Sequence, residues 1–290
     1  MMSEMSHMQD VRPGGDPERG SRNGTQNGTQ NGTQNGTENG AEHRTENGTE
    51  NGAQEVRPKL GSRAVLSLRF PPFPVPGEAD ESATAPHDPV RARQVVEELG
   101  TVEEVLEQLP DRLVADLPDP RVRADLELVA VGCWGNAVHI IDPALGGDFL
   151  TYAMTQEVRG QRARYPEARI VGSIEMDYGN SFLEDVVDLP GGVEAYAAGW
   201  DCDDEWDVAG DPEEVLRAIG IDREAAAEAG FDLDEDPCDR VWSDLGILAL
   251  WGLPGGLGVG PGAGGRRVSV FRVRRTSSAA SEMEEVWFGG

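Results

Sequence analysis

The densest group of side chains able to do chemistry is an acidic stretch, Asp-Cys-Asp-Asp-Glu-Trp-Asp, that begins at Asp201. Clustered carboxylate oxygens are the ligands that calcium and magnesium prefer, and a bound divalent cation can activate water for hydrolysis. The stretch does not complete a calcium-binding loop, because Trp206 stands where the sixth position needs glycine. One hypothesis is therefore a divalent-metal-assisted hydrolase of an unfamiliar type, with these metal ligands: Asp201, Asp203, Asp204 and Glu205.

The same segment supports a second hypothesis, which involves binding without catalysis. Trp200 and Trp206 flank the acids, and tryptophan is enriched at protein interfaces. An acidic surface that carries these indoles would attract a basic protein, with Trp200, Asp203, Asp204 and Trp206 as the binding residues. We expect a non-catalytic protein-binding or accessory protein, and we keep the hydrolase as the alternative.

Other residues with catalytic potential lack the neighbours that their chemistry needs. A formal GxGxxG begins at Gly260, but it leads into a predicted strand, whereas a dinucleotide-binding loop must open a helix. Ser173 lacks the second glycine of a nucleophile elbow. Cys133 and His139 share a predicted hairpin, in which a buried thiol and a strand histidine are simpler interpretations than a reactive pair. We therefore predict no catalytic residue and no cofactor.

The chain of 290 residues is strongly acidic, with a formal net charge of −28. Such a surface repels phosphates and anionic lipid headgroups, so we expect neither nucleic acid nor a membrane as a partner. The N-terminus lacks the basic and apolar regions of a signal peptide, and three scattered cysteines do not suggest a disulfide framework. We expect a cytoplasmic protein, and the composition leaves the oligomeric state open.

From Asn23 the sequence repeats Asn-Gly-Thr-Gln and close variants, in which no apolar position recurs. A segment of this composition cannot bury enough apolar surface to offset the entropy lost on ordering. The sequence therefore predicts a disordered tail over residues 1–60. The remaining residues, 61–290, have the length of one large domain and are predicted to fold as a single acidic unit.

The hydrophobic pattern of this body mixes hairpins with helices. Predicted strands cover residues 64–70, 126–131, 138–141, 170–177, 186–189, 193–196, 268–273 and 285–288. Predicted helices cover residues 88–99, 101–109, 150–165, 211–219 and 222–229. Because strands joined as hairpins pair antiparallel, we expect an α+β fold with a largely antiparallel sheet and packed helices.

Several short motifs of the body carry a resemblance to known sequences. They are Phe70-Pro71-Pro72-Phe73-Pro74, His87-Asp88-Pro89-Val90-Arg91, Trp134-Gly135-Asn136, Asp142-Pro143-Ala144-Leu145, Gly210-Asp211-Pro212, Phe271-Arg272-Val273-Arg274 and Glu284-Glu285-Val286-Trp287-Phe288. In these motifs the chain resembles an uncharacterised family of actinobacterial proteins of unknown function, over about residues 61–290. The resemblance implies no activity, cofactor or catalytic residue.

Overall fold

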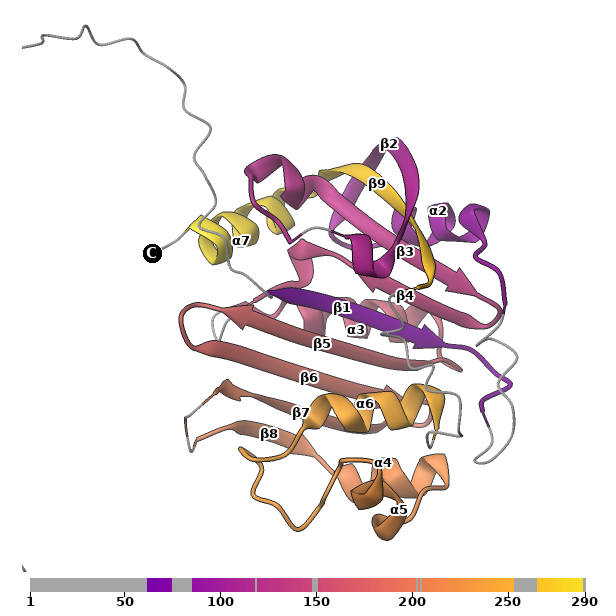
Figure 1. Cartoon of the computed structure of the whole chain (residues 1–290), viewed down its shortest axis with the longest axis vertical. Helices are drawn as coiled ribbons and strands as arrows, with labels where there is room; N and C mark the ends of the chain where they lie inside the picture. Colours follow the sequence, from indigo (N-terminus) through magenta and orange to yellow (C-terminus); the bar gives the residue numbers. More distant parts are fainter. Residues whose placement is uncertain are drawn as a thin grey trace, which may run out of the picture. The chain divides into compact units, whose positions relative to one another are not determined.

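The computed structural model describes residues 62–74, 85–117, 119–147, 151–201, 203, 205–252 and 265–288, so the repeat tail lies outside the described residues. The described strands form one sheet in the order β2-β9-β3-β4-β1-β5-β6-β7-β8 (Figure 1). Every neighbouring pair in this order is antiparallel. The strands are β1 Arg63–Arg69, β2 Val102–Leu113, β3 Leu128–Trp134, β4 Ala137–Ile141, β5 Arg169–Asp177, β6 Ser181–Leu189, β7 Val193–Trp200, β8 Asp207–Gly210 and β9 Arg267–Arg275.

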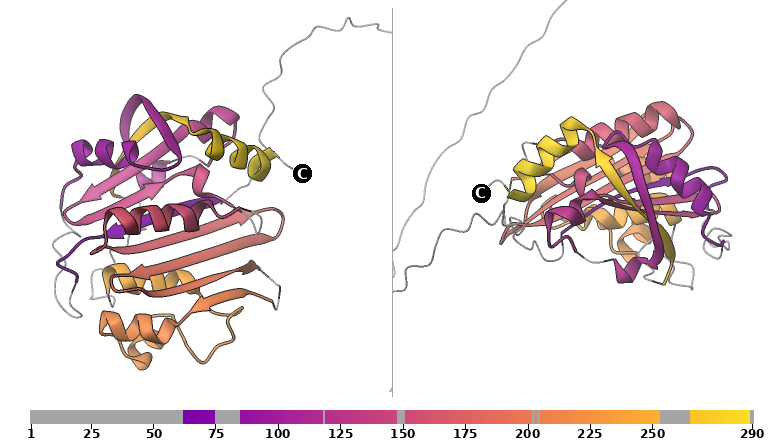
Figure 2. Two further views of the ribbon diagram at one scale, coloured as in Figure 1. Left: turned by 180° about the vertical axis from the view of Figure 1, so that it is seen from behind. Right: turned by 90° about the horizontal axis from the view of Figure 1, so that it is seen from above.

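The described helices lie on both faces of this sheet. They are α2 Pro89–Glu97, α3 Ala153–Arg164, α4 Pro212–Ile219, α5 Arg223–Glu228, α6 Trp242–Trp251 and α7 Ser277–Phe288. Helices α4, α5 and α6 lie in front of the β6–β8 end of the sheet in Figure 1. The left view of Figure 2 shows the molecule from behind, and there α2 and α3 lie in front of the sheet. The predicted α+β fold with a largely antiparallel sheet is confirmed.

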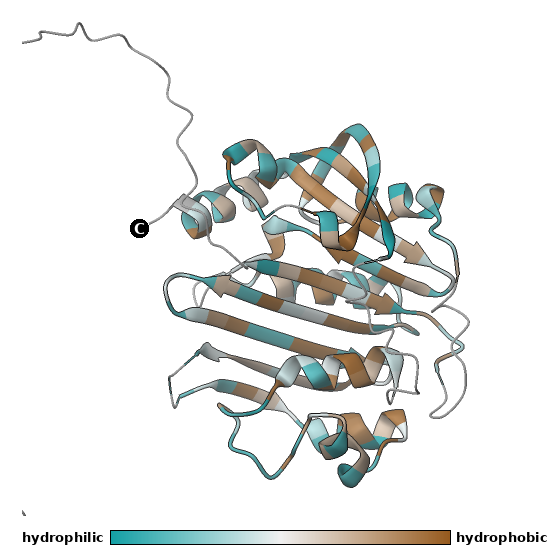
Figure 3. Cartoon of the chain, in the orientation of Figure 1, coloured by the Kyte–Doolittle hydropathy of each residue, from teal (hydrophilic) through white to brown (hydrophobic). Residues whose placement is uncertain are grey.

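Alternation along the strands separates the two faces. On β1, Leu66 and Leu68 are buried in the core beneath α2, α3 and α7, whereas the intervening Ser67 and Arg69 point to the face that carries α6. That second face has its own apolar core beneath α4 to α6. Figure 3 shows the result as apolar residues concentrated in the central strands, with hydrophilic residues in the connections. The sheet therefore serves as the rigid frame on which every candidate site is built.

Aspartates begin three of the predicted helices, and these starts are confirmed. The carboxylate of Asp88 accepts hydrogen bonds from the amides of Val90 and Arg91 at the start of α2. Asp211 and Asp222 accept in the same way at the starts of α4 and α5. Each carboxylate satisfies amides that have no partner inside the helix, which is why the sequence signal was sufficient.

The predicted helix over residues 101–109 is wrong, because this segment is strand β2. Its first four residues have the sequence of a capping box, in which the Thr101 hydroxyl would accept from the first turn. In the structure that hydroxyl instead donates to Asp142, 2.6 Å away. Glu104 and Glu107 lie opposite arginines of β9, so cross-strand pairing favours the extended conformation over the local helical pattern.

The predicted strand over residues 285–288 is also wrong, because these residues end helix α7. Ala279, Met283, Val286 and Trp287 are buried together against the first core. Their spacing of three and four residues is that of one helix face, which a window limited to the last four residues cannot reveal. Helix α6 and strand β8 were not predicted.

Candidate functional site

The acidic stretch predicted as a site forms the connection between β7 and β8, at one end of the sheet. Asp201, Asp203 and Glu205 are exposed there, whereas Cys202 and Asp204 lie outside the described residues. Strand β8, the last in the sheet order, pairs only with β7, and all four of its residues are exposed. The structure therefore brings the described acids next to a strand edge that no other described strand covers.

The two tryptophans that flank the acids do not share a surface. Trp200 packs against Phe182 and the first core, with ring centroids 5.3 Å apart. Trp206 packs against the second core, on the other face of the sheet, where its indole covers the α-carbon of Gly199. Each partly buried ring therefore packs against a different core, on opposite faces of the sheet.

The described residues do not decide whether the predicted metal ligands bind a metal ion. Among the residues that the structure describes, no three His, Cys, Asp or Glu side chains are grouped so that they could hold a metal ion. The predicted ligand set also contains Asp204, which lies outside those residues. Metal binding by Asp201, Asp203, Asp204 and Glu205 therefore stays a prediction.

The negative charge of this end extends well beyond the β7–β8 connection. Residues 201–240 hold 16 acidic side chains and three arginines. Arg217 and Arg223 pair with acids of the same segment, and Arg240 donates to backbone carbonyls of the loop before α6. Figure 3 draws this loop mainly in hydrophilic colours. Since the arginines are engaged locally, the end of the sheet at β8 presents a large excess of carboxylates to solvent.

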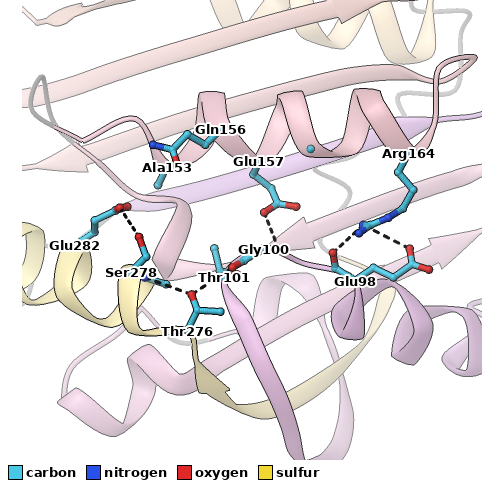
Figure 4. Close-up of a pocket in the computed structure, with 12 residues that line it drawn as sticks. Glu98, Gly100, Thr101, Ala153, Gln156, Glu157, Arg164, Thr276, Ser278 and Glu282 are labelled. Atoms are coloured by element: carbon cyan, nitrogen blue, oxygen red, sulfur yellow. Dashed lines mark hydrogen bonds and ion pairs between the residues drawn. The ribbon is translucent and has the colours of Figure 1, made fainter.

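A pocket of about 250 Å³ lies elsewhere, between α3, the turn that joins α2 to β2, and the start of α7 (Figure 4). Glu157 points from α3 to this turn, where its Oε2 accepts from the amide of Gly100 at 2.9 Å. Its Oε1 accepts from Gln161 at 2.7 Å. Burial raises the pKa of the Glu157 carboxyl, and these two hydrogen bonds oppose the rise. Both oxygens are thus occupied by protein donors.

The rim of this pocket is also bonded internally. Arg164 donates to the carbonyl of Glu98 at 2.7 Å, and Ser278 donates to Glu282 at 3.1 Å (Figure 4). A polar side chain that already has a protein partner must lose that partner before it can act on a ligand. The arrangement fits a structural junction between helices better than a reaction centre.

A buried ion pair lies close to the same junction and was not predicted. Arg275 Nη1 lies 2.7 Å from Asp142 Oδ1, and both side chains are almost inaccessible to solvent. Asp142 also accepts from the Thr101 hydroxyl and from the amide of Ala144. The group therefore ties the ends of β9, β2 and β4 together. Sequence alone carried little signal for it, because its members are far apart along the chain.

The possible Cys-His pair is separated by the sheet. Cys133 lies in the first core, whereas His139 is on the opposite face, with Nδ1 2.9 Å from the hydroxyl of Ser67. Burial raises the pKa of the Cys133 thiol to about 12, so the thiol stays protonated at neutral pH. The simpler interpretation, a buried thiol and a strand histidine, agrees with this geometry.

Two buried carboxyl groups in the middle of β6 were missed by the sequence analysis. Asp185 lies opposite Ser173 of β5, whose hydroxyl bonds to it, while its Oδ1 has no hydrogen-bond partner. Burial raises the pKa of Asp185 to about 7, and the negative charges of Asp244 and Glu175 add to the rise. Burial likewise raises the pKa of Glu184, on the other face, to about 7. The sequence signal was the pair Glu184-Asp185, which lies directly before the two valines that begin the predicted strand over residues 186–189.

Comparison with known proteins adds one result. Residues 48–290 match a family of unknown function, DUF6333. The chain belongs to this family. A search of curated proteins and a search of solved structures each returned no match. Membership of DUF6333 therefore agrees with the resemblance found in the sequence, and it brings no activity to test. Among the described residues of this DUF6333 protein, no helix has the length and apolar character needed to cross a membrane.

Proposed function

We propose that this DUF6333 protein is a non-catalytic binding protein that holds a basic segment of a partner protein at its acidic β8 end. The observation that carries the proposal is the coincidence of an exposed edge strand with uncompensated carboxylates. An edge strand offers backbone N–H and C=O groups to an added strand, and the surrounding charge selects the sign of the incoming side chains.

The structure changes which residues this proposal uses. Asp201 and Asp203 are exposed just before β8, and Asp207 is the exposed first residue of β8, so all three remain available to a partner. Trp200 and Trp206 act as anchors of the two cores. The binding surface is therefore acidic, without an aromatic centre, and we expect fast, salt-sensitive association. The same charge disfavours nucleic acid and anionic membranes as partners.

We place the protein in the cytoplasm. Cys133 and Cys238, the two cysteines that the structure describes, are free thiols. Disulfide bonds form and persist mainly in oxidising compartments, so free thiols are consistent with a reducing one.

A defined peptide tests the proposal. We expect a short peptide of alternating valine and lysine to bind the full chain at low salt, as measured by fluorescence anisotropy, and its valine-glutamate counterpart to show no binding. The affinity should fall strongly at physiological salt, where the Debye length shrinks to about 8 Å. Equal binding of both peptides, or binding insensitive to salt, contradicts the proposal.

Paired charge reversals locate the surface. Asp203→Lys combined with Asp207→Lys should lower the affinity for the lysine peptide at least tenfold, because both positions are exposed at the β8 edge. The matched control, Glu103→Lys combined with Glu285→Lys, makes the same change in net charge at exposed positions on β2 and α7. If the control weakens binding as much as the test variant, the net charge of the protein determines the affinity for the peptide, and the β8 site is wrong.

The metal-assisted hydrolase is the second candidate, supported by the acidic stretch beginning at Asp201. Calorimetry with calcium, magnesium and manganese tests it directly. Binding heat that Asp203→Asn removes supports it, whereas no heat and no change in melting temperature on adding EDTA rejects it.

A further inference from the structure

A second cavity lies on the sheet face that carries Ser67, away from β8. It has a volume of about 350 Å³ and lies between strands β1, β3, β4 and β9 and a segment that we call the strap. The strap comprises the last two residues of β2 and the residues that follow them (residues 112–117 and 119–125). The strap contains two short 3-10 helices, Val114–Asp116 and the beginning of Arg123–Glu127. We call this space the strap cavity.

The walls of the strap cavity are mainly apolar. The sheet contributes Val65, Ile141 and Val270, and the strap contributes Val114 and Leu117. A volume of this size lies at the lower end of the range typical for small-molecule sites, which are apolar pockets with few polar groups. The lining therefore fits a small, largely apolar molecule.

The charges that line the cavity balance each other. They comprise two arginines, Arg63 and Arg112, and two aspartates, Asp119 and Asp125. Asp125 is also held by the strap itself, since its Oδ2 accepts from the amides of Arg121 and Val122 at 2.8 and 3.0 Å. With two charges of each sign, the lining does not select an ion, so an uncharged ligand fits best.

His139 supplies a polar group at the floor of the cavity. It is 7% exposed and lines the space from β4. Nδ1 lies 2.9 Å from the Ser67 hydroxyl, so this hydrogen bond does not use Nε2. Burial, with a smaller effect of the nearby Arg266 charge, lowers the pKa of His139 to about 4, so the ring is neutral at physiological pH. Nε2 of a neutral imidazole can form a hydrogen bond with a ligand hydroxyl in either tautomer, or donate to a carbonyl when it carries the proton.

We infer that the strap cavity binds an uncharged, mainly apolar small molecule whose single hydroxyl or carbonyl group bonds to Nε2 of His139. This site is independent of the proposed function, because it lies on other strands and uses no residue of the β8 end. Its ligand would be recognised by shape and by one hydrogen bond.

Three related probes test the inference on the full chain: 2-naphthol, naphthalene and 2-naphthoate. We expect 2-naphthol to bind about fivefold tighter than naphthalene, the factor that one hydrogen bond typically adds. The anion 2-naphthoate should bind more weakly than 2-naphthol, because the lining carries no net positive charge. Equal affinities for naphthol and naphthalene, or tighter binding of naphthoate, would overturn the inference.

Two variants locate the binding. Ile141→Trp places a large ring in the cavity from a partly exposed position and should lower the affinity for 2-naphthol at least tenfold. Its control, Val208→Trp, makes the same kind of change on a 37% exposed valine of β8 and should leave binding unchanged. Unchanged binding by Ile141→Trp would place the probe elsewhere and reject the site.

The role of His139 has its own readout. His139→Phe keeps an aromatic ring and should bring the naphthol and naphthalene affinities within twofold of each other. If that variant does not fold, nitrogen NMR of the wild-type imidazole replaces it: the Nε2 resonance should shift on adding 2-naphthol and stay in place with naphthalene. A resonance that responds equally to both probes rejects the hydrogen bond.

Discussion

The buried carboxyl group of Asp185 makes the stability of this DUF6333 protein depend on pH in a predictable direction. Burial raises its pKa from 3.8 to about 7. The folded state therefore prefers the protonated form. Below pH 3.8 the group is neutral in both states, and the folded state has no penalty. As the pH rises to about 7 the unfolded chain ionises first, so stability falls, and above about 7 the penalty is constant.

The magnitude follows from the pKa values. A difference of about three units corresponds to about 4 kcal/mol of unfolding free energy above neutrality, at 1.36 kcal/mol per unit. Asp185→Asn removes the ionisation, and its amide oxygen can still accept from Ser173. The new NH₂ group meets the place where Oδ1 now has no partner, which adds an unfavourable contribution that does not depend on pH. The difference in stabilisation between two pH values therefore isolates the charge.

Urea unfolding followed by tryptophan fluorescence provides the measurement. We expect Asp185→Asn to increase the free energy of unfolding more at pH 8 than at pH 5, by about 2–3 kcal/mol. Glu194→Gln, an exposed substitution on neighbouring β7, is the matched control and should change stability by less than about 0.5 kcal/mol at either pH. If the effect of Asp185→Asn is equal at the two pH values, ionisation of Asp185 does not destabilise the folded state, and the reasoning from burial fails.

Three further changes have expected outcomes. Replacing Arg275 by leucine should destabilise the fold by about 3–5 kcal/mol in urea unfolding, because Asp142 would keep a buried charge without its cation; a loss below about 1 kcal/mol would contradict this. Gly199→Ala should lower the melting temperature, with a destabilisation of about 1–3 kcal/mol, because the new methyl group would lie 2.5 Å from the indole of Trp206; an unchanged melting temperature would show that the indole can move. Deleting residues 1–58 should leave the melting temperature unchanged, since the repeat has no recurring apolar position to bury; a drop of several degrees would count against that view.

Local signals predicted much of this fold. The three aspartate caps, the hairpins through Gly135-Asn136 and Pro190–Gly192, and the alternation on β5 each depend on residues close in sequence. Strand β2 could not be recognised in the same way, because its partner β9 is among the last elements of the chain. The Thr101 hydroxyl was assigned to a helix cap without knowledge of Asp142, which lies 41 positions further on.

The candidate site shows the same limit. The acids beginning at Asp201 were recognised from composition, and the exposed ones border the β8 edge. Trp200 and Trp206 were grouped with them because they are close in sequence, yet the turn between β7 and β8 sends them to opposite faces. The strap cavity could not be inferred, since its walls come from strands far apart along the chain.

The place of β9 between β2 and β3 has a consequence for synthesis on the ribosome. β9 is the last of the described strands to emerge, and neither β2 nor the neighbouring edge of β3 has its partner before then. A nascent chain with unpaired strand edges is exposed to pairing with other chains. The side chains of β2 that await β9 include Glu103, Glu104 and Glu107, which repel the identical strand of another copy. The arginines of β9 then neutralise two of these charges, so the strand that completes the sheet also ends the repulsion.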